Sequence, residues 1–165
     1  LIMEPEFVVC DEPISALDVS VQAQVVNLLG RLSQELGLTL LFIAHDLSMV
    51  RYVSHRMAVM YLGKLVEIGP ADQVYFSPKH PYSQTLIASN PQADPNIERS
   101  RASTTIQGEI PSPINVPTGC RFADRCPSVM PVCRSEEPAL ISLEQALEPP
   151  GDDASSPHRV ACHLY

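Results

Sequence analysis

The sequence predicts an α/β fold in the first half of the chain and a proline-rich, irregular extension in the second. Two apolar runs, Phe7–Cys10 and Leu38–Ile43, are typical of buried parallel strands, and a stretch of helical periodicity separates them. Only Pro5 and Pro13 of the 16 prolines precede residue 70. Because proline fixes φ and removes a backbone donor, residues 70–165 should form loops, short helices and isolated strands. The predicted domains are therefore 1–69 and 70–165.

Composition narrows the class of protein. The chain has 165 residues, 45% of them hydrophobic, and a formal net charge of −8, which suits one packed domain with an extension. The acidic balance argues against nucleic acid as a partner, because nothing broad would neutralise phosphates. The longest nearly apolar run, Leu38–Ala44, is too short to cross a bilayer. The chain opens at Leu1 without an initiator Met, so we expect a fragment.

The predicted helix after the first strand rests on apolar residues at helical spacing. Asp18 is expected to cap its start and Gly37 to follow its end. The residues that carry this periodicity are Val21, Val25, Leu28, Leu29, Leu32 and Leu36.

The second strand leads into Ala44-His45-Asp46, where Asp46 is expected to cap a helix over Leu47–Val53. Arg56–Tyr61 and Lys64–Ile68 then predict a hairpin around Leu62-Gly63. This order of elements predicts part of a three-layer α/β domain whose sheet has an antiparallel edge.

Polar residues follow both predicted parallel strands. Asp11 and Glu12 end the first strand and His45 ends the second, so we expect them along one rim of the sheet. A carboxylate there can hold Mg²⁺, a second can orient water, and an imidazole can donate to a phosphate oxygen. The alternative is that Asp11 and Glu12 only begin the turn before Pro13.

Three motifs together carry a family resemblance. Phe7–Pro13 (FVVCDEP), Ser15–Asp18 (SALD) and Phe42–Asp46 (FIAHD) resemble the Walker B strand, D-loop and switch histidine of ABC transporter ATPases. Ser15–Leu29 and Leu47–Lys64 are similar to the dipeptide/oligopeptide importer group, most closely its second ATPase subunit. The resemblance implies the C-terminal part of a P-loop NTPase (ABC ATPase) domain, followed by a cysteine-containing extension.

The resemblance also implies roles for single residues. Asp11 would support Mg²⁺, Glu12 would be the general base or water-orienting carboxylate, and His45 would contact the γ-phosphate and attacking water of ATP. Ser15 and Asp18 would belong to the loop that meets a second ABC ATPase subunit.

Other motifs of that family are missing from this sequence. It contains no G-x-x-x-x-G-K-[ST] loop, no LSGGQ-like signature and no upstream Gln loop. In the family these motifs precede the Walker B strand. We therefore expect the parent protein to hydrolyse ATP and the isolated fragment to be inactive.

The extension holds two further motifs. His80-Pro81-Tyr82 is similar to the HPY segment of the peptide-importer group; Pro81 suits the first position of a short helix, and His80 is expected to be structural. Four cysteines follow with the spacing C-x5-C-x6-C-x28-C, whereas Cys10 is expected to be a buried apolar residue. The four are Cys120, Cys126, Cys133 and Cys162.

The sequence allows several chemical states for these four thiols: disulfides, a metal site or free thiols. Three disulfide pairings are conceivable, but an ATPase in a reducing cytosol favours metal ligation. Four thiolates suit zinc or a [4Fe–4S] cluster, and the zinc spacing fits poorly. The resemblance implies the cluster, and vacant thiols are the remaining alternative.

The leading functional hypothesis is the energy-coupling ATPase subunit of a peptide importer. It implies permease subunits as partners, an extracytoplasmic peptide-binding protein as an indirect one, and a peripheral position on the cytoplasmic face of the inner (plasma) membrane. The alternatives are a non-catalytic, metal-stapled regulatory module and a non-transport ABC-type ATPase.

Overall fold

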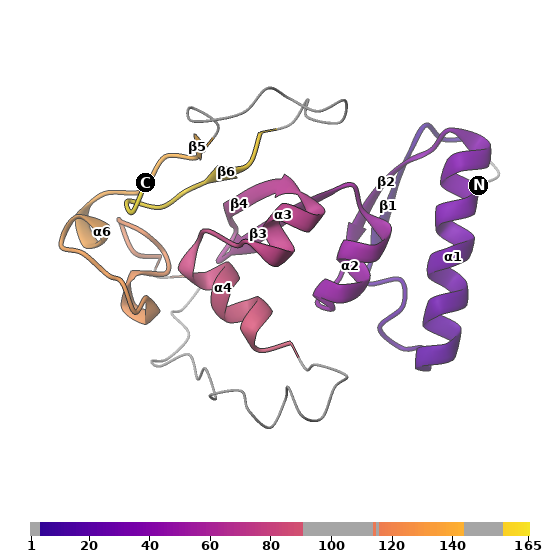
Figure 1. Cartoon of the computed structure of the whole chain (residues 1–165), viewed down its shortest axis with the longest axis horizontal. Helices are drawn as coiled ribbons and strands as arrows, with labels where there is room; N and C mark the ends of the chain where they lie inside the picture. The colour runs from indigo at the N-terminus through magenta and orange to yellow at the C-terminus, as the bar shows by residue number, and fades with distance from the viewer. Residues whose placement is uncertain (1–3, 91–113, 115, 144–156) are drawn as a thin grey trace. The chain divides into compact units, whose positions relative to one another are not determined.

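A computed structural model describes residues 4–90, 114, 116–143 and 157–165 (Figure 1). The chain divides into two compact units, Leu1–His55 and Arg56–Tyr165, which we call the parallel-strand unit and the hairpin unit. The division falls at residue 55, whereas the distribution of prolines predicted a boundary near residue 69. Among the described residues, no helix is both long and apolar enough to span a membrane.

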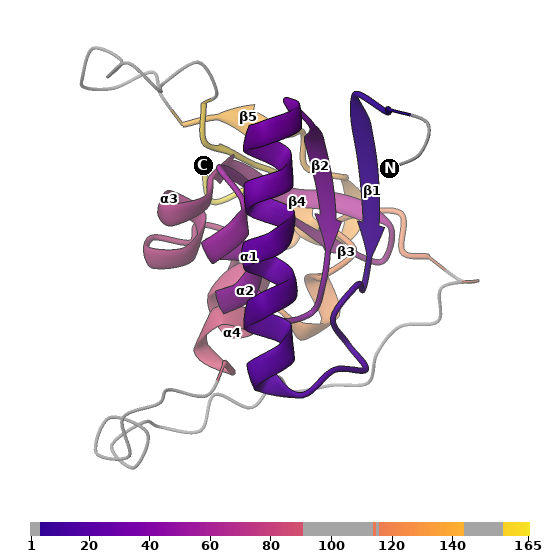
Figure 2. The ribbon, with the colours of Figure 1, turned by 90° about the vertical axis from the view of Figure 1, so that its right-hand side faces the viewer.

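The parallel-strand unit has the predicted β-α-β-α order. Strands β1 and β2 pair in parallel, with Phe7 opposite Thr39 and Asp11 opposite Ile43, and run side by side in Figure 2. Gly37 follows α1 with φ of 64°, and its N–H donates to the Ser33 carbonyl, as its predicted position requires. The elements are β1 (Phe7–Asp11), α1 (Val19–Leu36), β2 (Thr39–Ile43) and α2 (Leu47–Val53).

The two faces of this strand pair differ in burial. Phe7, Val9, Leu41 and Ile43 are between 44% and 54% exposed, whereas the residues that alternate with them are buried or half-buried. Successive residues of a strand point to opposite faces, so the exposed residues share one apolar face.

The hairpin unit begins with β3 (Arg56–Tyr61) and β4 (Lys64–Pro70), confirming the predicted antiparallel hairpin. Leu62 and Gly63 both have positive φ, 45° and 75°, as a tight two-residue hairpin turn requires. The later elements are α3 (Ala71–Phe76), α4 (Pro81–Ala88), η1 (Ala123–Arg125), α6 (Val132–Ser135), β5 (Ile141–Ser142) and β6 (Arg159–Val160).

One topological prediction was wrong. The hairpin is not an edge of the parallel sheet but belongs to a second sheet of order β3-β4-β6-β5. The edge of β4 is taken by β6, with Glu67 opposite Val160. Because β6 comes from the end of the chain, no local pattern could reveal this pairing.

Close packing joins the segments of the hairpin unit. Phe122 is 1% exposed, and its ring centroid lies 5.2 Å from that of Tyr61 and 5.4 Å from that of Tyr82. A Cβ on Gly119 would lie 2.4 Å from the Cys133 carbonyl oxygen, so only glycine fits there. The cysteine-bearing segment therefore packs directly on the hairpin and α4.

Candidate functional site

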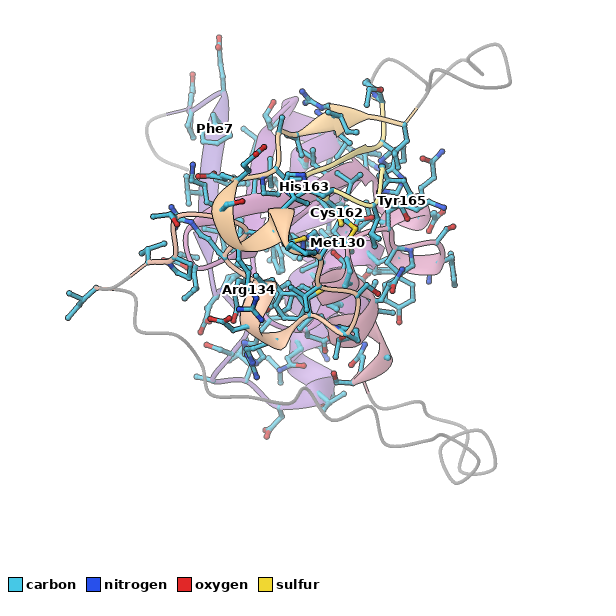
Figure 3. All side chains as sticks on the ribbon, turned by 90° about the vertical axis from the view of Figure 1, so that its left-hand side faces the viewer. Phe7, Met130, Arg134, Cys162, His163 and Tyr165 are labelled. Carbon is cyan, nitrogen blue, oxygen red and sulfur yellow. The ribbon has the colours of Figure 1, made fainter. Side chains whose placement is uncertain are left out.

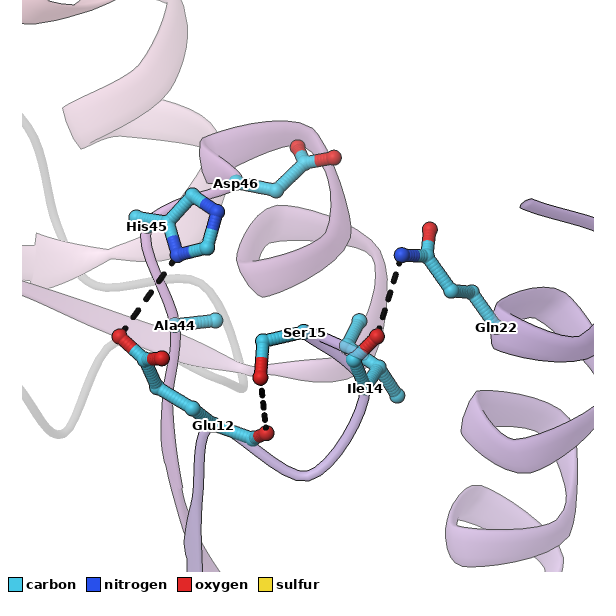
Figure 4. A pocket seen from close by; sticks show the side chains of 7 residues that line it. All are labelled: Glu12, Ile14, Ser15, Gln22, Ala44, His45 and Asp46. Carbon is cyan, nitrogen blue, oxygen red and sulfur yellow. Dashed lines mark hydrogen bonds and ion pairs between the residues drawn. The ribbon is translucent and has the colours of Figure 1, made fainter. Parts of the chain in front are cut away.

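A small pocket lies where β1 and β2 end (Figure 4). The parallel register brings the two strand ends together, and the Glu12 N–H donates to the Ile43 carbonyl at 2.9 Å. The pocket is built from the β1–α1 loop, the N-terminal part of α1 and the β2–α2 connection. Its lining residues are Glu12, Ile14, Ser15, Gln22, Ala44, His45 and Asp46.

Glu12 and His45 face each other across this pocket. The His45 Nδ1 lies 3.7 Å from the Glu12 Oε1, and the two side chains are 77% and 54% exposed, respectively. The pair is thus close enough to share a ligand or a water molecule and open enough to admit one.

The backbone at Glu12 is unusual. Its φ is 44°, a left-handed conformation that costs a non-glycine residue roughly 1–2 kcal/mol. The Ser15 hydroxyl and N–H both donate to the Glu12 carbonyl, at 3.1 Å and 3.3 Å. Strained backbone of this kind is found at functional sites, where neighbouring contacts hold it in place.

The other predicted residues of this rim lie outside the pocket lining. Asp11 is exposed at the last position of β1, and Asp18 stands at the start of α1. Asp18 occupies the predicted cap position, but its side chain makes no capping hydrogen bond. Asp46 does cap α2 as predicted, accepting from Ser48 N at 2.9 Å and from Met49 N at 3.2 Å.

A second glutamate–histidine pair lies buried in the hairpin unit. Glu67 is 0% and His158 is 5% exposed, and the His158 Nε2 donates to the Glu67 Oε1 at 2.7 Å. The backbone N–H groups of Lys79 and His80 also donate to the Glu67 carboxylate, at 2.7 Å and 2.9 Å. Although burial raises the pKa of Glu67, these hydrogen bonds outweigh it and hold the pKa below its usual value.

His80 completes this network as a structural group. Burial lowers its pKa to about 4, against an opposing effect of the Glu67 carboxylate, so the ring is neutral near pH 7. Its Nδ1 accepts from the Tyr82 N–H at 3.0 Å and caps α4, which begins at Pro81 as predicted. Sequence reasoning did not single out Glu67, because its partners lie 12 to 91 residues away.

The four clustered cysteines lie in the same unit as free thiols. Burial raises the pKa of Cys120, and the neighbouring Cys133 and Cys162 thiols raise it further. Burial likewise raises the pKa values of Cys126 and Cys162. These shifts keep the three thiols protonated near neutral pH.

The structure does not support the predicted metal ligation. In the described ranges, no group of three or more His, Cys, Asp or Glu side chains could hold a metal ion. Two arginines of this segment have partners other than the thiols: Arg121 donates to the Leu62 carbonyl, and Arg134 contacts Asp124 at 2.6 Å. The nearby His163 Nε2 lies 3.0 Å from the Glu136 carbonyl oxygen (Figure 3). The [4Fe–4S] assignment and the zinc alternative are therefore left without a site.

The sequence is similar to those of known transport proteins. Residues 66–133 match the C-terminal region of oligopeptide/dipeptide transporters. This chain is 53% identical to the putative oligopeptide transport ATP-binding protein YkfD of Bacillus subtilis over 165 residues, which is 100% of this chain. Residues 66–133 therefore belong to the family of the oligopeptide/dipeptide transporter C-terminal region, and the whole chain is similar to oligopeptide transport ATP-binding proteins.

Other transport ATP-binding proteins show a similar degree of sequence identity to this chain. The oligopeptide transport ATP-binding protein OppF of Salmonella typhimurium is 54% identical over 140 residues, 85% of this chain. The probable peptide ABC transporter ATP-binding protein y4tS of Sinorhizobium fredii is 46% identical over 164 residues, 99% of this chain. The chain spans 47%, 42% and 43% of the lengths of these three relatives, respectively.

Proposed function

We propose that this chain is part of the ATP-hydrolysing, energy-coupling subunit of a peptide importer. The observation that carries the proposal is the open Glu12–His45 pair at the ends of two parallel strands. Relatives named as oligopeptide transport ATP-binding proteins support it, because they resemble this chain over most or all of its length.

In this proposal each residue at the ends of β1 and β2 has its own role in phosphoryl transfer. The Glu12 carboxylate orients the attacking water and accepts its proton, and His45 donates to the γ-phosphate of ATP and helps to hold that water. The exposed carboxylate of Asp11 suits Mg²⁺, which keeps several water ligands and needs only one or two carboxylates. The ion would neutralise charge on the phosphates of the substrate.

The remaining assignments follow from the family. Ser15 and Asp18 face a second ABC ATPase subunit, and permease subunits hold the protein at the cytoplasmic face of the membrane. A peptide-binding protein acts with them indirectly. Residues 1–69 contribute the ATPase part and residues 70–165 the extension. Because these 165 residues contain no G-x-x-x-x-G-K-[ST] loop, the chain alone is inactive.

The test is steady-state ATP hydrolysis by the assembled transporter that contains this chain. Glu12→Gln should lower kcat by about 10²- to 10⁴-fold with little change in KM, because it removes the proton acceptor and leaves nucleotide contacts in place. Glu35→Gln is the matched control, since Glu35 is exposed on α1, where it pairs with Arg31 at 3.9 Å. Wild-type kcat in the Glu12→Gln protein would refute the proposal.

A further inference from the structure

Gln22 connects α1 to the loop that carries Glu12. It is the fourth residue of α1, and its Nε2 donates to the Ile14 carbonyl at 3.1 Å (Figure 4). Its backbone N–H donates to the Asp18 carbonyl at 2.8 Å. One residue therefore holds both the first and the last residue of the segment 14–18.

Three structural features show why the hydrogen bond from Gln22 matters for this loop. Glu12 has a left-handed backbone, and the hydroxyl of Ser15 donates to its carbonyl from the far side of the turn. Ile14 is 4% exposed, so its carbonyl, which faces the Gln22 amide, is only partly accessible to water. Asp18 makes no capping bond with its side chain, whereas the Gln22 side chain ties this loop to the helix.

We propose that Gln22 is a positioning residue for Glu12. By holding the Ile14 carbonyl, Gln22 keeps the Glu12–Asp18 turn in the conformation that aims the Glu12 carboxylate at His45. Gln22 does not itself reach the reacting atoms; it acts through the loop. The inference rests on the proposed ATP hydrolysis at this pocket.

The first arm of the test measures the loop itself by hydrogen exchange on the full chain. Ser15 N–H donates to the Glu12 carbonyl and Leu17 N–H to the Ile14 carbonyl, so both amides report on the turn. Gln22→Met keeps the length of the side chain but has no donor, and it should accelerate exchange at both amides by about five- to tenfold. Gln24→Met changes an exposed residue on the same helix, so the Ser15 and Leu17 amides of this variant should exchange at the wild-type rate.

Unchanged exchange at Ser15 and Leu17 in Gln22→Met would overturn the proposal. Gln22→Asn provides a second variant, because it remains polar but is one methylene too short to reach Ile14; it should show the same loosening. An unaltered unfolding midpoint in either variant shows that the effect is confined to the loop.

The second arm measures ATP hydrolysis by the assembled transporter. Gln22→Met and Gln22→Asn should lower kcat by about five- to tenfold while KM changes less than twofold, because the loop aligns the chemistry and not the nucleotide. A raised KM with unchanged kcat would contradict the positioning role. If the wild type hydrolyses no ATP, the proposed function fails, and the exchange arm still decides whether Gln22 holds the loop.

Discussion

The chain contains two glutamate–histidine pairs with opposite surroundings. Glu12 and His45 lie 3.7 Å apart with exposed side chains, whereas Glu67 and His158 lie 2.7 Å apart with side chains 0% and 7% exposed. The buried carboxylate accepts from the His158 ring and from two backbone N–H groups. The comparison teaches that residue type alone does not mark a functional site: the open pair can receive a ligand, and the buried pair is already saturated.

The largest expected difference between the pairs is in stability. Glu67→Gln replaces the carboxylate that accepts three hydrogen bonds by a neutral amide. It should destabilise the hairpin unit by about 3–5 kcal/mol, as removal of a buried charged partner does. Glu12→Gln should leave the unfolding free energy nearly unchanged, because Glu12 is exposed. Urea unfolding of both variants measures this, and equal losses would show that the two pairs are not different in kind.

The pH dependence of stability should come from the buried network. The pKa of His80 is about 4 in the folded chain against 6.5 when unperturbed, chiefly through burial. As pH falls from 6.5 to 4, the unfolded chain binds this proton first, so stability should fall by on the order of 3 kcal/mol. The lowered pKa of Glu67 adds a further loss at lower pH, as its carboxylate is protonated.

His80→Asn tests this assignment, since asparagine can accept from the Tyr82 N–H but does not titrate. Urea midpoints measured between pH 7 and pH 4 should fall less steeply in this variant than in the wild type. Identical slopes would place the titrating group elsewhere.

A smaller contrast concerns two glycines. Gly119→Ala should destabilise the hairpin unit by about 1–3 kcal/mol, because the new Cβ would overlap the Cys133 carbonyl. Gly30→Ala in α1 should stabilise the parallel-strand unit by about 1 kcal/mol, because nothing lies within 4 Å of its Cβ position. Thermal unfolding measures both changes. A stabilising Gly119→Ala or a destabilising Gly30→Ala would mean that the packing differs from that described.

Local signals explain why much of the fold could be predicted. Gly37 ends α1 with a left-handed backbone, Asp46 caps α2, and Leu62-Gly63 make the hairpin turn. Each of these features depends on residues within a few positions of one another. The strand-end placement of Glu12 and His45 followed in the same way from the parallel pairing of β1 and β2.

The remaining features depend on contacts that sequence proximity does not reveal. The pairing of β6 with β4 and the His158–Glu67 bond join segments 91 residues apart. Gln22 was hidden because its side chain turns back to a loop carbonyl eight positions earlier. The four clustered cysteines suggested a metal site, but among the described residues no group of three or more potential ligands could hold a metal ion.

The most direct test of the open pair is a double-mutant cycle on ATP hydrolysis by the assembled transporter. The cycle compares Glu12→Gln, His45→Gln and the double variant with the wild type. If the two side chains act on one water and one phosphate as a unit, the double variant should be scarcely slower than Glu12→Gln alone. Fully multiplicative losses in kcat, or no loss from either single change, would contradict the account.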